Sequence, residues 1–163
     1  MKHIIFLRHA QTEPFHLDGD HARNLTAYGK QQARYMAPHC AAIDGLKRVI
    51  VSDAVRTIQT SDIIFHDKND RLDITISDSL YLAPMSDIFS VLTHSSDDDD
   101  NMMIIAHNPG LTDIIQHLVC SHELNKITSA IAPCTLVHMT ADIKYWAELS
   151  PKSCQIAHYI IAE

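Results

Sequence analysis

Three short apolar runs, each followed by a polar turn and then a helical pattern, constrain the fold of this 163-residue chain most strongly. The runs HIIFL (3–7), RVIVS (48–52) and NMMIIA (101–106) are apolar throughout, as is typical of strands buried on both faces. LDITIS (72–77) alternates, which indicates an outer strand of the same sheet. Strands that alternate with helices predict an α/β fold with a mainly parallel central sheet and helices on both faces, in three layers.

Capping signals place helices between these strands. Thr26 can cap a helix, in which Pro38 predicts a kink or an early end. Asp53 can cap a second helix over 54–65. Asn108 is followed by proline and then by an apolar stripe of helical spacing, so we expect it to cap a third helix.

The C-terminal part of the chain predicts a hairpin rather than another helix. CTLVHMT (134–140) and IKYWAELS (143–150) are expected to pair and to join the edge of the sheet. The four aspartates at 97–100 lack the spacing of a calcium-binding loop and predict a solvated loop. The length favours a single domain over residues 1–163.

Composition argues against several classes of partner. A formal net charge of −7 is unfavourable for non-specific binding to the nucleic acid backbone. The stretch MKHIIFLRHA does not resemble a secretory signal, and no run approaches the ~20 apolar residues of a membrane-spanning helix. We therefore expect a cytoplasmic protein that contacts neither nucleic acid nor membrane.

Cysteines and histidines are numerous but lack the spacing of a metal site. Cys40, Cys120, Cys134 and Cys154 form no C-x-x-C pair, which favours reduced thiols. Twelve histidines are present, yet none lies in an H-x-x-x-H or H-E-x-x-H arrangement. The sequence therefore predicts neither a metal nor another cofactor.

Polar side chains follow each of the three buried strands at the point where the strand ends. Arg8 and His9 follow the first, Arg56 lies in the first helical turn after the second, and His107 follows the third. Ligands of open parallel sheets bind beyond the carboxyl ends of the strands, so we expect these four side chains to meet there. Arg56 could instead be a surface residue that pairs with a nearby aspartate, Asp53 or Asp62.

Two arginines and two histidines together suit phosphoryl chemistry. Guanidinium groups match the oxygens of a phosphate and stabilise the charge that spreads over them during transfer. A neutral imidazole can attack phosphorus and form a covalent intermediate, and a second imidazole can donate a hydrogen bond as charge builds. This chemistry requires no metal.

Four segments of the chain resemble the histidine phosphatase superfamily, whose members have the phosphoglycerate-mutase-like fold. FLRHAQTE (6–13) is similar to the Arg-His signature of that family, and RNLTAYGKQQA (23–33) to the segment that follows it. VSDAVRTIQT (51–60) resembles the second-arginine segment, and IIAHNPGLTD (104–113) the second-histidine segment. More narrowly, nearly the whole chain resembles the SixA-type phosphohistidine phosphatases, least so after about Ser121.

The resemblance implies a role for each residue at the strand ends. His9 would be the phosphorylated nucleophile, and Arg8, Arg56 and His107 would form the phosphate pocket. Arg23 matches a family arginine near the pocket, and a pair with Asp20 explains it equally well. Thr12 and Asn108 are weaker candidates for the lining of the site.

The resemblance departs at the residue that would protonate an oxygen leaving group. In relatives that hydrolyse phosphate esters, a carboxylate follows the third strand along the chain, where this chain has Leu82. Asp78 and Asp87 flank this position and are better explained as turn or helix-cap residues. Other candidates for the acid lie on the loop after His9 and are Glu13, Asp18 and Asp20. General acid catalysis typically contributes ~10²–10⁴-fold, and the nitrogen of phosphohistidine is a much better leaving group than an alkoxide. A site without a general acid therefore favours phosphohistidine.

These observations predict a metal-independent phosphohistidine phosphatase. Its substrate would be a phosphohistidine-bearing signalling or phosphotransfer protein, for example a phosphotransfer domain. Two alternatives stay open: a phosphomonoesterase for small phosphorylated molecules, and a module that binds a phosphorylated ligand without turnover.

Overall fold

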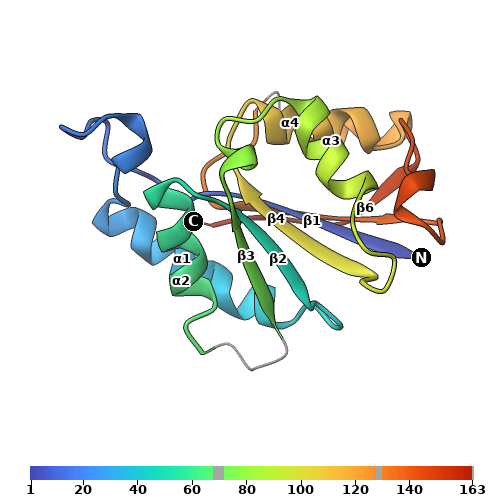
Figure 1. The fold of residues 1–163 in the computed structure, drawn as a ribbon, viewed down its shortest axis with the longest axis horizontal. Coiled ribbons are helices and arrows are strands. Elements are labelled where there is room, and N and C mark those ends of the chain that lie inside the picture. Colours follow the sequence, from blue (N-terminus) through green and yellow to red (C-terminus); the bar gives the residue numbers. More distant parts are fainter. Residues whose placement is uncertain (68–71, 128–129, 163) are drawn as a thin grey trace.

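A six-stranded sheet in the order β3-β2-β4-β1-β5-β6 forms the centre of the computed structural model, which describes residues 1–67, 72–127 and 130–162 (Figure 1). The strands are β1 (Lys2–Arg8), β2 (Arg48–Ser52), β3 (Asp73–Ser77), β4 (Asn101–Ala106), β5 (Thr135–Ala141) and β6 (Cys154–Ile161). The helices are α1 (Ala27–Ala41), α2 (Val55–Ile64), α3 (Met85–Thr93) and α4 (Gly110–Leu118). Short 3-10 helices are η1 (Asp20–Ala22), η2 (Asp78–Leu80), η3 (Ser121–Lys126) and η4 (Trp146–Glu148).

The first four strands in chain order are parallel, as the sequence predicts. β2 pairs with β3 and β4, and β4 pairs with β1, all in parallel. The register pairs Arg8 with Ala106 and Val51 with Ile105, so these strands end at the same edge of the sheet. β5 and β6 add to β1 in antiparallel fashion. The predicted fold class, a mainly parallel α/β sheet, is confirmed.

Helices cover both faces of the sheet and bury a separate apolar cluster on each. In Figure 1, α1 and α2 lie below the sheet and α3 and α4 lie above it. Because successive residues of a strand point to opposite faces, Ile5 and Leu7 pack toward α1 while Ile4 and Phe6 pack toward α4. β1 is therefore buried on both sides, which explains its continuous apolar run.

Of the three predicted helix caps, the cap of α1 is confirmed and the caps of α2 and α4 are wrong. The Thr26 hydroxyl accepts a hydrogen bond from Gly29 N at 2.9 Å, so it caps α1 as predicted. α1 continues past Pro38 to Ala41, which rules out the early end. The cap of α2 is not Asp53, whose carboxylate lies 3.0 Å from the ring of His21 instead.

The predicted cap of α4 is also wrong by one residue. Pro109 is the cap, and the Asn108 side chain is used elsewhere: it donates to Ile131 O at 3.0 Å and accepts from Thr112 Oγ1 at 3.0 Å. The helix packs closely at its start, because a Cβ on Gly110 would lie 2.0 Å from Ala83 O. Only glycine allows this contact between α4 and the segment before α3.

The hairpin exists, but its second strand lies later than predicted. β5 pairs with Cys154–Ile161, while the expected strand at 143–150 forms a loop and η4. Trp146 of that segment is fully buried and donates its indole N–H to Asp99 O at 2.9 Å. The aspartates at 97–100 form the predicted loop, which the buried Lys2 ammonium ties to β1 through Asp97 O at 2.8 Å and Asp100 Oδ1 at 2.9 Å.

Neither a membrane span nor a metal cluster is found in the part of the chain that the structure describes. Each helix there is too short or too polar to cross a bilayer. Across the same residues, no three histidine, cysteine or acidic side chains are grouped so as to hold a metal ion.

Candidate active site

A pocket of about 340 Å³ lies at the edge of the sheet where the parallel strands end, and it brings the predicted residues together. All five of them line it: Arg8, His9, Arg23, Arg56 and His107. Further lining residues are Thr12, Asp20, Leu82 and Asn108. Thr12 and Asn108 thus lie where the sequence suggested.

His9 follows directly after β1 and is held as a neutral ring with one nitrogen available. Its Nδ1 lies 2.8 Å from Ala10 O. A carbonyl only accepts hydrogen bonds, so Nδ1 carries the proton and Nε2 keeps its lone pair. Burial, aided by the positive charges of Arg56, Arg8 and Arg23, lowers the His9 pKa to about 4 against the opposing effect of the Ala10 hydrogen bond. A neutral imidazole with a free Nε2 is suited to nucleophilic attack.

His107 lies beside His9, with 5.2 Å between the ring centroids. Its Nε2 lies 2.8 Å from the hydroxyl oxygen of Ser52, which is the last residue of β2. Its Nδ1 is buried without a hydrogen-bond partner. Burial, followed by the neighbouring His9 and Arg56, lowers the His107 pKa to about 3. When the Ser52 hydroxyl donates to Nε2, the ring proton resides on Nδ1, which is then a donor for a ligand in the pocket.

Arg8 and Arg56 each keep a buried nitrogen without a partner. Arg8 donates from Nη1 to Ile131 O at 2.7 Å, and Arg56 donates from Nη1 to Asp20 O at 2.7 Å. The Nε atoms of both side chains are buried and unpaired. A buried donor that lacks a partner costs about 1–3 kcal/mol, so these nitrogens favour a ligand that accepts hydrogen bonds.

The carboxylate of Asp20 accepts hydrogen bonds from two arginines, Arg23 and Arg56, and from one tyrosine. Its Oδ1 accepts from Arg23 Nη1 at 2.8 Å, and its Oδ2 accepts from Arg56 Nη2 at 2.9 Å and from the Tyr81 hydroxyl at 2.8 Å. These donors, Arg23 first, lower the pKa of Asp20 well below its usual range. The carboxylate therefore stays ionised and holds the guanidinium groups in place.

The partner of Arg56 differs from the surface alternative. Asp20 comes from the connection between β1 and α1, whereas the expected partners were Asp53 and Asp62 on or near α2. Arg56 is 2% exposed, so its position in the first turn of α2 is not a surface one. The carboxylate offsets the unfavourable interaction between a cation and the positive end of the helix dipole.

Tyr81 is a site residue that the sequence reasoning missed. Beyond its hydrogen bond to Asp20, its ring packs edge-on against His107 with centroids 5.6 Å apart and lies 5.8 Å from the Arg56 guanidinium carbon. The signal in the sequence was its position immediately after η2, next to Leu82. No motif that we used assigns meaning to a tyrosine there.

Residues 11–26, the arm, connect β1 with α1 and contribute Arg23 to the pocket. Arg23 donates from Nε to Glu13 O at 2.6 Å and from Nη2 to Thr12 Oγ1. Both explanations offered for Arg23 therefore hold in geometry, because it pairs with Asp20 and also lines the pocket.

Leu82 occupies the pocket wall where a carboxylate acid would be expected. Its backbone is in the left-handed region at φ 48°, and its side chain is 51% exposed. Among the lining residues that the structure describes, Asp20 is the one carboxylate. Since Asp20 is held ionised, it is poorly suited to donate a proton at neutral pH.

The end of β1 is fixed by the strand that follows in the sheet. Cys134, just before β5, donates its backbone N–H to Arg8 O at 3.2 Å and to His9 O at 3.0 Å. Its own backbone lies at φ 55°, and burial raises the pKa of its thiol to about 12. Cys134 therefore contacts the end of β1 through its backbone, while its buried thiol stays protonated.

Comparisons with known proteins agree with this geometry. Residues 4–81 match the sequence model of the histidine phosphatase superfamily (branch 1). A Haemophilus influenzae protein named phosphohistidine phosphatase SixA homolog is 26% identical over 129 residues, which cover 71% of this chain and 76% of the relative.

Solved structures share the fold over nearly the full length. A candidate phosphohistidine phosphatase SixA from Agrobacterium tumefaciens superimposes with a TM-score of 0.83 at 18% identity, covering 98% of this chain and 97% of its own. The protein histidine phosphatase SixA complexed with tungstate gives a TM-score of 0.79 at 17% identity, with 98% and 97% covered. The resemblance inferred from the sequence and the phosphoglycerate-mutase-like fold are both confirmed.

Proposed function

Starting from the likeness of this chain to the histidine phosphatase superfamily, we propose that it is a metal-independent phosphohistidine phosphatase. Its substrate is a phosphohistidine-bearing protein, and His9 forms the covalent intermediate. The observation that carries the proposal is the pocket itself, in which a neutral His9 lies beside three unpaired buried nitrogens: Arg8 Nε, Arg56 Nε and His107 Nδ1.

The reaction proceeds in two displacements at phosphorus. His9 Nε2 attacks the phosphoryl group and the bond from phosphorus to the substrate imidazole breaks; that ring, protonated on its other nitrogen, leaves as a neutral imidazole, while phosphorylated His9 keeps its Nδ1 proton. The three unpaired nitrogens donate to the phosphoryl oxygens as their charge develops. Water then attacks phosphorus, the bond from phosphorus to His9 breaks, His9 leaves as a neutral ring, and inorganic phosphate is released as the dihydrogen ion with both protons of the water.

The proposed leaving group follows from Asp20 and Leu82. Hydrolysis of an ester requires a proton for the departing oxygen, whereas Leu82 has no proton to give and Asp20 is held ionised by Arg23, Tyr81 and Arg56. An imidazole that is already protonated on its other nitrogen leaves as a neutral ring without such an acid. The pocket therefore favours a phosphorus–nitrogen bond over a phosphorus–oxygen bond.

A trapping experiment tests the intermediate. Radiolabelled phosphohistidine peptide is mixed with the wild type and quenched, and we expect a phosphoenzyme that is labile to acid and stable to alkali. His9→Ala should form none and should lose at least about 10⁴-fold in kcat. His117→Ala, a histidine outside the pocket, serves as the matched control and should label as the wild type does.

A substrate comparison tests the leaving group. We expect kcat/KM on the phosphohistidine peptide to exceed that on any member of a phosphate ester panel by at least about 10²-fold, the lower range for a missing general acid. Faster turnover of an ester would contradict the assignment and support the phosphomonoesterase alternative. Tight binding of phosphohistidine with no turnover at any pH would support a binding module.

A further inference from the structure

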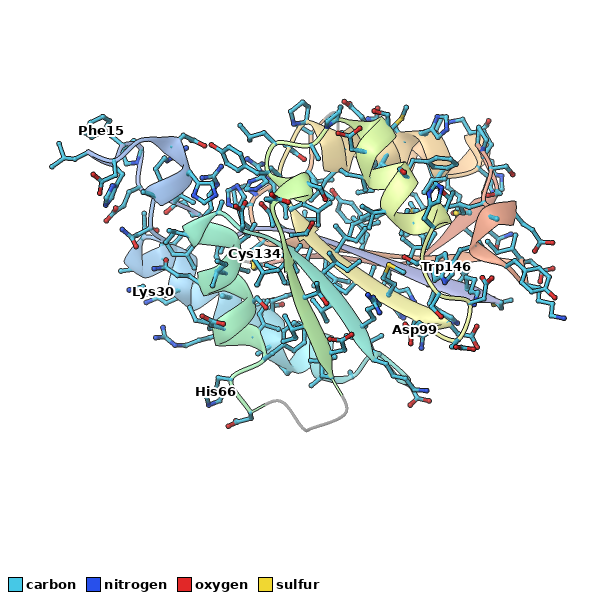
Figure 2. All side chains as sticks on the ribbon, viewed as in Figure 1. Phe15, Lys30, His66, Asp99, Cys134 and Trp146 are labelled. Carbon is cyan, nitrogen blue, oxygen red and sulfur yellow. The ribbon has the colours of Figure 1, made fainter. Side chains whose placement is uncertain are left out.

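The tip of the arm, residues 15–18, exposes two large apolar side chains. Phe15 is 69% exposed and Leu17, two residues later, is 91% exposed. In Figure 1 the arm projects from the body of the molecule, and Figure 2 shows Phe15 at its outer end, clear of the sheet and of the helices. Single exposed apolar residues are common on protein surfaces, but two together on a projecting segment beside a pocket indicate a contact surface.

The stem of the arm, residues 11–14 and 19–26, is held by hydrogen bonds, which fix the position from which the tip projects. Thr12 and Leu25 form an antiparallel bridge, and Glu13 N donates to Asn24 O at 2.9 Å. Leu25 N in turn donates to Gln59 Oε1 on α2 at 2.8 Å. The exposure of the tip is therefore a property of an anchored segment.

The stem lines the pocket and the tip does not. Thr12, Asp20 and Arg23 line the pocket, whereas neither Phe15 nor Leu17 is among the described residues that line it. A phosphoryl group bound among the lining residues is therefore held by side chains other than those of the tip. A ligand that contacts both must present an extended surface, which a small phosphorylated molecule lacks.

Charge at the tip indicates what that surface carries. Asp18 follows Leu17 directly and its side chain is 83% exposed, with His16 Nδ1 at 3.7 Å from its carboxylate. The chain as a whole has a formal net charge of −7. The complementary surface is an apolar patch bordered by lysine or arginine.

We propose that Phe15 and Leu17 dock the folded protein that carries the phosphohistidine, and so select a protein over a small-molecule substrate. This inference rests on the proposed function and adds the place of docking. The half-exposed Leu82 provides a further apolar side chain at the wall of the pocket itself. Because the stem that holds Asp20 also carries the tip, a docked protein is aligned with the arginines that Asp20 positions.

The test compares one variant on two substrates. Phe15→Ser/Leu17→Ser is assayed on a phosphorylated phosphotransfer domain and on free phosphohistidine. We expect kcat/KM on the domain to fall by about tenfold or more, through KM, with less than a twofold change on free phosphohistidine. Tyr35→Ser on α1, which removes a side chain of 46% exposure outside the pocket and the arm, should change neither rate.

The other outcomes overturn the inference in distinguishable ways. An equal loss on both substrates would mean that the arm acts through the pocket itself. Unchanged rates on both would mean that the tip contacts no substrate. A wild type that hydrolyses neither substrate would overturn the proposed function, and the docking role with it.

Discussion

Two groups of histidines lie beside opposite ends of β1 and share most of the features by which a site is usually recognised. His9 and His107 line one pocket with ring centroids 5.2 Å apart, and His3 and His138 line another with the same separation. The pockets have volumes of about 340 and 360 Å³. Burial lowers the pKa of both His9 and His138 to about 4.

The two groups differ in what the imidazole nitrogens contact. His3 Nδ1 and His138 Nε2 lie 2.9 Å apart and satisfy each other. In the pocket at the carboxyl end, each ring is oriented by an oxygen atom and keeps a nitrogen for a ligand, beside three guanidinium groups. Among the described residues that line the other pocket, none is arginine or lysine. Clustered and buried histidines do not by themselves identify a site; the surrounding cations do.

The largest expected difference between the groups is catalytic. His107→Ala removes the buried, unpaired Nδ1 donor of a residue that lines the pocket, and we expect kcat on a phosphohistidine peptide to fall by about 10²–10³-fold, as for the loss of one donor to a developing oxyanion. His138→Ala is the matched control at the other end of β1 and should change kcat by less than twofold. Comparable losses in both variants would abolish the distinction drawn between the pockets.

A smaller effect is expected from the carboxylate that distinguishes the first pocket. Asp20→Asn keeps the side-chain shape but removes the charge that holds Arg23 and Arg56, so kcat should fall by about tenfold. Removal of a negative charge beside the ligand should also strengthen the binding of inorganic phosphate and so lower its inhibition constant. Steady-state kinetics with phosphate as inhibitor measures both changes.

Asp18→Asn on the same arm provides the comparison for that variant. Its side chain is 83% exposed and pairs with His16 at the surface. For this variant, kcat on a phosphohistidine peptide and the inhibition constant of inorganic phosphate should both stay as in the wild type. A fall in kcat for Asp20→Asn with weaker phosphate inhibition would mean that Asp20 acts on the fold of the arm rather than on the charge of the pocket.

The smallest effect concerns stability and comes from the second group. The His138 pKa of about 4 lies below the ~6.5 of an unfolded chain, so between these values the unfolded state binds more protons. The free energy of unfolding therefore falls as the pH is lowered through this range. His138→Leu removes one contributor, and also a buried Nδ1 without a partner.

Urea unfolding at pH 7 and pH 5 measures this effect. We expect the loss of stability between the two pH values to shrink by about 1 kcal/mol in His138→Leu, with activity at pH 7 unchanged. The same loss in variant and wild type would show that His138 does not contribute to the pH dependence.

The strands that form the centre of the fold could be predicted because they are buried on both faces. β1, β2 and β4 read as continuous apolar runs, and a run of this kind has few other structures open to it. β6 was missed because it is an edge strand in which only Cys154 is buried and which carries polar residues such as Gln155 and His158. The apolar residue Trp146 in the segment predicted as a strand is buried, but it is buried from η4.

The strand-end rule was sufficient for the residues that line the pocket and insufficient for their partners. Arg8, His9, Arg56 and His107 could be placed together because parallel strands end at one edge. The bridge from Arg56 through Asp20 to Tyr81 spans 36 and 61 positions in the sequence and depends on how the arm folds back over α2. Local patterns carry no information at that range.

Cys134, whose backbone holds the end of β1, also bears on the redox behaviour of the pocket. Oxidants attack thiolates, and burial raises the pKa of Cys134 to about 12, of Cys40 to about 12 and of Cys154 to about 11. At physiological pH these three thiols stay protonated. In the proposed mechanism the working group is the imidazole of His9, and peroxide would find no reactive thiolate at the neighbouring Cys134.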